Sequence, residues 1–347
     1  MSDEIRQALA DLLGSMPSDD VRAAPHLAAR RMLDRLVADG WTRVGLATAL
    51  GGSGGGIREA ASVTAACAAS GHLLPVADMV VCSARLLEIA GLELPADIRC
   101  AVPVAAPGTC DRRGRIQVRA QRVPWARWAS HFLVIASCDG GAQVSLVDAA
   151  AAEISAGRSV AGEARDGVVL MDALPVCSAS AGRALPDVLE QVQLAGALAR
   201  SVQMAAGTEK VLQLSVRYCL QRRQFGRSLA EFQAVQQQLA GLAGESAAAS
   251  AAVAHALDGL PSAPADWLVA PVAVAKIRTG MAAGAAARAA HQVHGAIGIT
   301  QEYPLHRHTT ALWSWREEYG GEQQWARALA GALVSGSADP WQAIAPA

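Results

Sequence analysis

The stretch Arg222-Arg223-Gln224-Phe225-Gly226, followed by Gln233, separates two long segments whose residue patterns are helical. It places two cations, an aromatic ring and a glycine at a corner between helices. An arginine guanidinium forms bidentate hydrogen bonds with phosphate, and the free N–H groups at a helix start favour anions. The corner therefore suits the pyrophosphate and adenine of a dinucleotide. An arginine pair beside a turn is also typical of a solvated helix end, so these residues alone leave both interpretations open.

The surrounding sequence resembles the C-terminal domain of the acyl-CoA dehydrogenase family. In that family a Tyr precedes Arg-x-x-Phe-Gly, and a Phe-Gln pair opens the next helix; here these are Tyr218, residues 222–226 and Phe232-Gln233. A second family segment follows at residues 290–298 (Ala-His-Gln-Val-His-Gly-Ala-Ile-Gly) and continues through Glu302-Tyr303-Pro304-Leu305. Residues 36–41 and the glycine-rich residues 51–56 are similar to the family's first domain.

Length and patterning predict an α+β fold in three parts, which is also the order that the resemblance implies. Residues 1–95 have helical periodicity and predict an N-terminal helical domain, with helices over 29–37, 60–69 and 76–89. Residues 96–185 contain short β-branched runs and predict a small, shortened β domain. Residues 186–340 predict a four-helix bundle, with helical segments at about 187–220, 228–258, 265–293 and 304–334.

The glycine-rich residues 51–56 look at first like a nucleotide-binding loop. They lack the Lys-Ser/Thr of a P-loop and do not follow a strand. We therefore predict a flexible connector.

The resemblance implies FAD as the cofactor and identifies its contact residues. These are Arg222, Gln224, Phe225, Gly226, Gln233, Gln292, Gly295 and Ala296. In this family these elements hold the adenine and pyrophosphate of an FAD that lies across a subunit interface.

The resemblance also implies a catalytic carboxylate that removes the α-proton of an acyl-CoA thioester. An ungapped alignment places Tyr319 where the family has this Glu, and phenol is a poor base at neutral pH because its reference pKa is near 10. The other position that some members use falls on Gly196-Ala197, which has no acid. Glu318 could serve only if the local register slipped by one residue. The family's flavin-ring loop is not recognisable in residues 102–111.

The chain thus keeps one half of the family's FAD site and lacks the other half. This pattern predicts a base-less subunit that completes the FAD site of a catalytic acyl-CoA dehydrogenase partner, as in α2β2 heterotetramers that act on steroid side-chain CoA esters, with the acyl-CoA bound mainly by the partner. Two alternatives stay open. The chain could form a self-sufficient homotetrameric flavoenzyme with Glu317, Glu318 or Glu322 as base, or a flavin-free helical scaffold.

Composition excludes several other classes of function. The formal net charge of −1 gives no field that would recruit nucleic acid or an acidic membrane. The sequence has no apolar run long enough to predict a membrane span. The polar N-terminus and seven scattered Cys residues are typical of a reducing cytoplasm. No ligand set for a metal is expected, because His291 and His294 have no third partner at matching spacing. His306 and His308 are expected to face solvent, and Trp313, Trp315 and Trp325 to be core or interface residues.

Overall fold

The computed structural model describes residues 2–15, 25–138, 141–261 and 265–336. Within these ranges the chain packs as two compact units. Unit 1 comprises Met1–Ala199 with Pro261–Asp266, and unit 2 comprises Arg200–Leu260 with Trp267–Ala347. Each unit is described by itself below.

The helices of unit 1 precede its sheet. They are α1 (Ser2–Gly14), α3 (Pro25–Ala38), α4 (Ile57–Ser70), the π-helical turn η3 (Asp78–Ser83) and α5 (Ala84–Ala90). The three predicted helices in this region are confirmed. The face of α3 that carries Leu33 and Leu36 is buried, and Gly40 follows the helix with a φ of 78°, in the left-handed region that favours glycine.

The glycine-rich connector is a close-packed turn rather than a loose chain. The Gly52 N–H donates to the Ala47 carbonyl at 3.1 Å, and the Gly54 N–H donates to the Leu46 carbonyl at 3.0 Å. A Cβ on Gly52 would lie 1.9 Å from the Leu46 carbonyl oxygen, so only glycine fits there. The prediction of a connector is confirmed, but its expected looseness is wrong, since its backbone bonds tie it to the residues before it.

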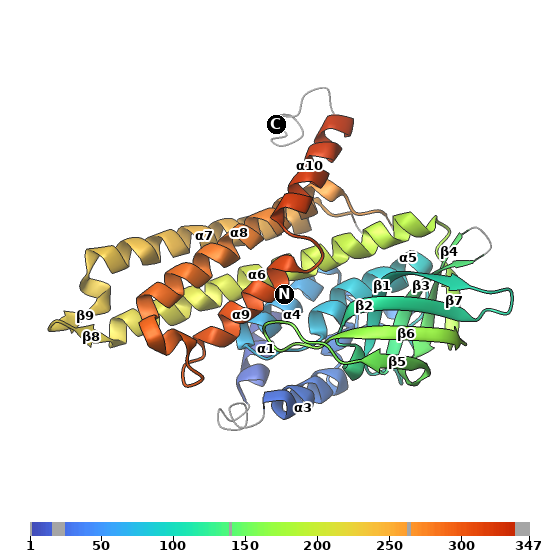
Figure 1. Ribbon diagram of the computed structural model, residues 1–347, viewed down its shortest axis with the longest axis horizontal. Coiled ribbons are helices and arrows are strands. Elements are labelled where there is room, and N and C mark those ends of the chain that lie inside the picture. The colour runs from blue at the N-terminus through green and yellow to red at the C-terminus, as the bar shows by residue number, and fades with distance from the viewer. Residues whose placement is uncertain (1, 16–24, 139–140, 262–264, 337–347) are drawn as a thin grey trace. The chain divides into compact units, whose positions relative to one another are not determined.

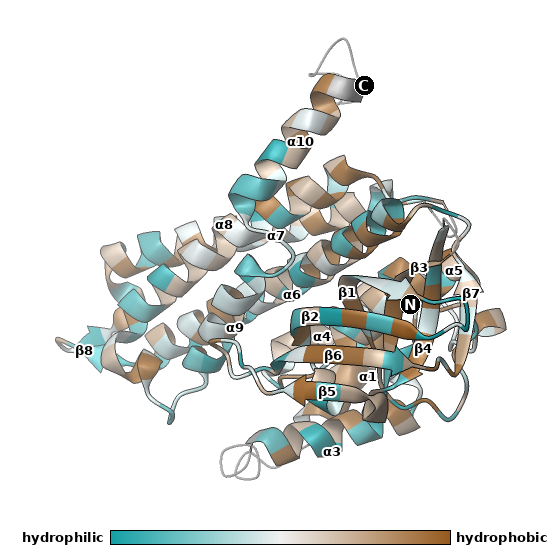
Figure 2. Cartoon of the chain, turned by 45° about the vertical axis from the view of Figure 1, so that its right-hand side comes forward, coloured by the Kyte–Doolittle hydropathy of each residue, from teal (hydrophilic) through white to brown (hydrophobic). Residues whose placement is uncertain are grey.

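One seven-stranded sheet follows these helices in unit 1, in the order β5-β6-β2-β1-β3-β4-β7 (Figure 1). Its strands are β1 (Ala101–Cys110), β2 (Ile116–Pro124), β3 (His131–Cys138), β4 (Gly141–Asp148), β5 (Ala152–Ser155), β6 (Arg165–Ala173) and β7 (Cys177–Ser180). The β1–β3 pair is parallel, and the other pairs are antiparallel. Buried and exposed residues alternate along much of β2, visible as brown and teal bands in Figure 2.

The predicted strands are confirmed, and two short strands escaped prediction. The edge strands β5 and β7 have four residues each, and most of their side chains are polar or small. Residues 102–111, where no flavin-ring loop could be recognised, lie mostly within β1. The register of β1 against β3 shifts between Val104 and Pro107, because proline has no N–H to donate to the ladder.

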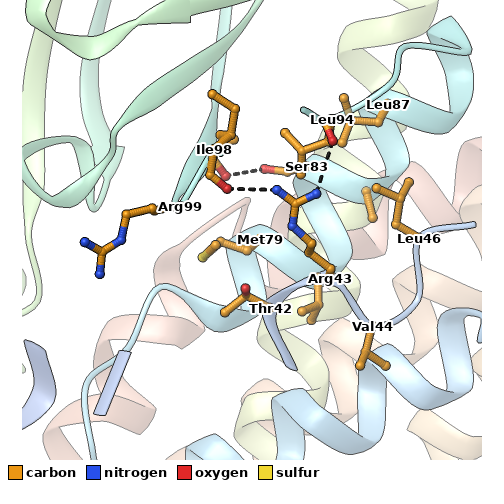
Figure 3. A pocket seen from close by; sticks show the side chains of 13 residues that line it. Thr42, Arg43, Val44, Leu46, Met79, Ser83, Leu87, Leu94, Ile98 and Arg99 are labelled. Atoms are coloured by element: carbon orange, nitrogen blue, oxygen red, sulfur yellow. Dashed lines mark hydrogen bonds between the residues drawn. The ribbon is translucent and has the colours of Figure 1, made fainter. Parts of the chain in front are cut away.

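Arg43 connects the glycine-rich turn to the segment that precedes β1. Its guanidinium donates to the carbonyls of Gly51 (2.7 Å), Leu94 (3.1 Å), Pro95 (2.6 Å), Ala96 (3.2 Å) and Ile98 (3.0 Å). Figure 3 shows this side chain at the wall of a cavity of about 20 Å³, beside Thr42, Met79 and Ser83. Such a volume has room for about one water molecule and none for an organic ligand.

Unit 2 is built from long helices and one small hairpin. Helix α6 (Leu185–Gln221) begins in unit 1 and continues into unit 2. It is followed by β8 (Arg223–Gln224), β9 (Arg227–Ser228), α7 (Gln233–Gly259), α8 (Val269–His294), α9 (Leu305–Glu317) and α10 (Glu322–Gly336). The first three predicted helical segments are confirmed. The fourth, predicted as one helix over 304–334, is wrong, because the chain leaves the helix at Glu318 (ψ 141°) and re-enters it at Glu322.

The domain boundaries at 95/96 and 185/186 stay predictions. Strands do begin at Ala101 and helices resume at Leu185, but the compact units divide the chain inside α6. In the described part of the chain, no helix combines the length and the apolarity needed to cross a membrane.

Candidate functional site

The Arg-Gln-Phe-Gly stretch forms a tight hairpin after α6. Gln224 pairs with Arg227, and the two residues between them have positive φ, 51° at Phe225 and 81° at Gly226. Positive φ at both central residues is the geometry of a type I′ turn, which suits a two-residue hairpin. The Arg222 N–H donates to the Tyr218 carbonyl at 2.8 Å, so Arg222 lies one helical turn beyond Tyr218.

Phe225 projects into solvent from the hairpin and rests against Phe232. Its side chain is 92% exposed. Its ring makes an edge contact with Phe232, with centroids 6.2 Å apart, and the Arg227 guanidinium lies 4.0 Å from the Phe232 ring centroid. A large apolar side chain held this far into water, at a positive φ, indicates a surface that another molecule covers.

The second expected segment lies at the end of α8. Gln292 is in the last turn of the helix, and Gly295 ends it with φ 62° and ψ −144°. These angles are accessible to glycine and strained for other residues. Gln292, Gly295 and Ala296 are exposed.

Aromatic rings connect the two segments within unit 2. The Tyr218 and His294 rings are stacked with centroids 4.5 Å apart, and Tyr303 contacts both rings at 5.7 and 5.0 Å. Figure 1 shows the hairpin, the start of α7 and the α8–α9 connection at the same end of these helices. The structure thus brings the eight expected cofactor residues to one end of unit 2, and all eight are exposed. Their cofactor role stays a prediction.

The position expected for the catalytic base is built very differently. Tyr319 has a φ of 55°, and the Arg200 guanidinium lies 5.4 Å from its ring centroid. The Glu318 carboxylate accepts a hydrogen bond from Arg200 Nε at 2.6 Å, and the two side chains are 8% and 1% exposed. The carboxylate is thus paired with an opposite charge inside unit 2. In this conformation Glu318 is an internal ion-pair partner rather than an accessible base.

A lysine completes this buried cluster. Lys276 of α8 donates to the last carbonyls of α9, those of Trp315 (3.3 Å) and Arg316 (2.7 Å). Burial lowers the Lys276 pKa to about 8, against the opposing effect of Glu322. The other two candidate bases are no better placed, since Glu317 is exposed and Glu322 binds Arg316 Nε at 2.5 Å.

Sequence analysis did not identify Arg200 and Lys276. Lys276 lies in the run Val-Ala-Val-Ala-Lys-Ile, and Arg200 follows an equally apolar stretch of α6. A lone cation inside an apolar helix is a signal for a buried ion pair or cap, and it could have directed attention to both residues.

Three of the histidines differ from simple helix-end residues. His308 was expected to face solvent, and this prediction is wrong, because its side chain is 5% exposed and burial lowers its pKa to about 4. His294 is 4% exposed, and His291 Nε2 lies 3.0 Å from the Thr309 hydroxyl. Burial lowers the pKa of both rings. Among the described residues, no three His, Cys, Asp or Glu side chains are grouped to hold a metal ion.

The expectation that the three tryptophans are core or interface residues is confirmed for two of them, and the cysteines are mostly buried. Trp315 and Trp325 are buried, whereas Trp313 is 43% exposed and stacks on His291. Of the cysteines, Cys67, Cys82, Cys100 and Cys219 are buried and the other three are half-buried.

Comparison with known proteins agrees with this architecture. Residues 189–332 match the family model "Acyl-CoA dehydrogenase, C-terminal domain". The acyl-CoA dehydrogenase IpdE2 of Mycobacterium tuberculosis is 34% identical over 110 residues, which is 32% of this chain and 32% of that protein. The matched part therefore spans about a third of the length of this curated relative.

Two solved structures share the fold across nearly the whole chain. The ChsE4–ChsE5 complex from Mycobacterium tuberculosis gives a TM-score of 0.81 at 22% identity and covers 97% of this chain and 98% of that chain. The Tcur3481–Tcur3483 steroid ACAD gives a TM-score of 0.82 at 21% identity, covering 97% and 99%.

The chain has the fold of an acyl-CoA dehydrogenase. Its residues 189–332 match the C-terminal domain of the acyl-CoA dehydrogenase family, whose members are FAD-dependent flavoproteins. The exposed residues at the end of unit 2 fit part of such a cofactor. Arg222 presents an exposed guanidinium, a group of the kind that binds phosphate, Phe225 presents a flat apolar surface, and Gly295 adds no side chain at the end of α8.

Proposed function

We propose that this chain is a subunit of an FAD-dependent acyl-CoA dehydrogenase and supplies the adenine and pyrophosphate half of an FAD site to a catalytic partner subunit. The observation that carries the proposal is a contrast within unit 2. The eight cofactor-contact residues are exposed at one end, while the base position holds Tyr319 beside a Glu318 that is bound to Arg200. A half-site on the surface needs a second chain to complete it.

The residues of this chain bind and orient, and the partner performs the proton transfer. Arg222 would hold the pyrophosphate by charge-assisted hydrogen bonds, and Phe225 would offer its ring to the adenine. Gln224, Gln233 and Gln292 supply amide donors and acceptors around the same end of the unit. When bound, FAD accepts the hydride from the β-carbon of the acyl group. The base that removes the α-proton belongs to the partner in this proposal.

Two relatives support an assembly of unlike subunits. The ChsE4–ChsE5 structure is a complex, and the other structure pairs two names under the description steroid ACAD. We extend this to an α2β2 assembly that introduces an α,β double bond into an acyl-CoA, with a steroid side-chain CoA ester as the substrate class. The partner binds most of the acyl-CoA.

The test is the flavin absorbance per chain, measured on the protein purified alone and again after co-expression with a catalytic acyl-CoA dehydrogenase. We expect little flavin in the chain alone and about one FAD per pair of unlike chains in the assembly. Arg222→Ala should weaken FAD retention by roughly ten- to a hundredfold, because a hydrogen bond to a charged group contributes about 1.5–3 kcal/mol.

The matched control is Arg112→Ala, which removes an exposed arginine of the β1–β2 turn and should leave FAD retention unchanged. One FAD per chain in the protein alone, with dye-reducing activity on an acyl-CoA, would contradict the proposal and favour a self-sufficient enzyme. An intact assembly in which neither chain holds flavin would favour the scaffold alternative.

A further inference from the structure

The three rings of Tyr218, His294 and Tyr303 contact one another in unit 2, and we call them the aromatic triad; His294 is buried and the two tyrosines are half-buried. The triad joins three segments that are far apart in sequence, namely the last turns of α6, the end of α8 and the end of the loop before α9. Each ring contacts the other two, with centroid distances of 4.5, 5.0 and 5.7 Å.

Polar contacts fix the orientation of the triad. The Tyr218 hydroxyl donates to the His294 carbonyl at 3.4 Å, and the Tyr303 hydroxyl donates to the Leu214 carbonyl of α6 at 3.3 Å. His294 Nδ1 lies 2.8 Å from the Ala290 carbonyl, so Nδ1 carries the proton and Nε2 is the unprotonated nitrogen of the neutral ring. Nε2 is buried and has no hydrogen-bond partner within the described part of the chain.

The triad is connected directly to both cofactor segments. Arg222 follows Tyr218 by one turn through its backbone bond to the Tyr218 carbonyl, and Gly295 follows His294 in the chain. The stack therefore sets the distance between the Arg222 side of the half-site and its Gln292–Gly295 side. No other ring contact among the described residues connects these two segments.

We propose that the aromatic triad positions the two cofactor-binding segments relative to each other, with Tyr218 and His294 as positioning residues for FAD. This inference rests on the proposed function, since FAD is the ligand whose two contact segments the triad joins. It assigns a role to two residues outside the eight expected cofactor-contact positions.

Burial disfavours the protonated form of His294 and lowers its pKa, which gives the inference a pH signature. A protonated His294 would be a buried cation whose Nε2–H has no acceptor in the triad. The groups that face it are the Tyr218 phenol of α6, His291 of α8 and the Tyr303 phenol of the loop, and none of these is a carboxylate. Acid should therefore loosen the half-site as the pH falls below about 6.5, the reference pKa of histidine.

The experiment measures the FAD dissociation constant of the reconstituted assembly with its catalytic partner, from pH 8 to pH 5. Tyr218→Leu and His294→Gln should each weaken FAD binding by about three- to tenfold, the range of one aromatic pair. The double variant should be no weaker than the worse single variant, because both changes remove the same stack. Tyr218→Phe keeps the ring and should stay within about twofold of the wild type.

His294→Phe supplies the readout that a purely structural role would not change. It keeps a stacking ring that cannot be protonated, so FAD affinity at pH 8 should be largely retained and the loss between pH 7 and pH 5 should shrink. The control is His308→Gln, which alters another buried histidine of unit 2 that makes no ring contact among the described residues and should leave the affinity at pH 8 unchanged.

The outcomes separate this inference from the proposed function. An assembly of wild-type chains without FAD would contradict the proposed function and the inference with it. Normal FAD binding by the wild type, with Tyr218→Leu and His294→Gln unchanged or with losses that multiply in the double variant, would overturn the positioning role alone.

Discussion

The most informative single residue is Glu318, because its surroundings decide whether this chain has a base of its own. The carboxylate lies 2.6 Å from Arg200 Nε, and Arg200 also donates to Gln203 at 2.9 Å. These contacts hold the acid inside unit 2 next to Tyr319, the position at which the sequence resemblance predicts the catalytic Glu. A buried charge of this kind is costly to leave without its partner.

Glu318→Ala should therefore lower the free energy of unfolding by about 3–5 kcal/mol, the usual cost of breaking a buried ion pair from one side. The measurement is denaturant unfolding of the chain alone, followed by the fluorescence of its tryptophans. Glu317→Ala is the matched control, because Glu317 is the adjacent acid and is exposed, and it should change stability by less than about 0.5 kcal/mol.

The paired replacement Arg200→Met with Glu318→Met should recover much of the loss, since removing both charges leaves no unpaired ion. If Glu318→Ala costs no more than Glu317→Ala, the ion pair does not hold this carboxylate. Glu318 would then return as a candidate base.

At the scale of the element, the expected cofactor residues lie at or next to the ends of helices. Helix α8 ends at Gly295, whose φ of 62° and ψ of −144° no other residue adopts without strain. A Cβ at this position would meet nothing within 4 Å, so the restriction comes from the backbone and not from crowding.

Gly295→Ala should destabilise unit 2 by about 1–3 kcal/mol, the cost of a backbone held in a sparsely populated region. Gly241→Ala provides a control of opposite sign. Gly241 is exposed in the interior of α7 with open space around it, and alanine there should stabilise the helix by about 0.5–1 kcal/mol. Thermal unfolding of both variants tests this pair, and a stabilising Gly295→Ala would show that α8 does not need this ending.

Local sequence signals predicted most of the elements correctly, and long-range contacts explain the failures. Helical periodicity and turn residues identified α3, α4, α7, α8 and the corner after α6, because each signal lies within the element that it specifies; that the corner is a β-hairpin was not predicted. The break between α9 and α10 was missed. The turn contains Gly320 at a φ of 96°, a local breaker that the prediction passed over, and Glu318, whose ion-pair partner Arg200 is 118 residues away. The triad was missed for the same reason, since no spacing in the sequence places Tyr218 against His294 and Tyr303.

At the scale of the whole molecule, the two units contribute differently to the response to pH. Two carboxylates of unit 1, Asp111 and Asp166, have a lowered pKa; Asp166 accepts hydrogen bonds from Arg127 and from the Gly157 N–H, which favour its ionised form. Unit 2 instead contains three histidines whose pKa is lowered by burial: His291, His294 and His308. The buried histidines should therefore make unit 2 the more acid-sensitive part.

His308 sets the size of this effect. Its folded-state pKa of about 4 lies below the reference value of 6.5, because burial disfavours the cation and Lys210, Arg307 and His306 repel it. Between these two values the unfolded chain binds more protons than the folded chain, so stability is full above about pH 6.5 and falls as the pH approaches 4. The total loss from this one residue is about 3 kcal/mol, since each unit of pKa difference corresponds to about 1.4 kcal/mol.

We therefore expect the free energy of unfolding to fall steeply between pH 6.5 and pH 4.5, measured by denaturant titration at fixed ionic strength. His308→Gln removes the titrating group and should flatten this part of the curve while lowering stability at pH 7.5 by less than the acid loss that it removes. His26, on α3 in unit 1, is exposed, and His26→Gln should leave the slope unchanged. A slope that is the same in His308→Gln and the wild type would mean that His308 is protonated without cost, and hence that the α9 interior opens to water in acid.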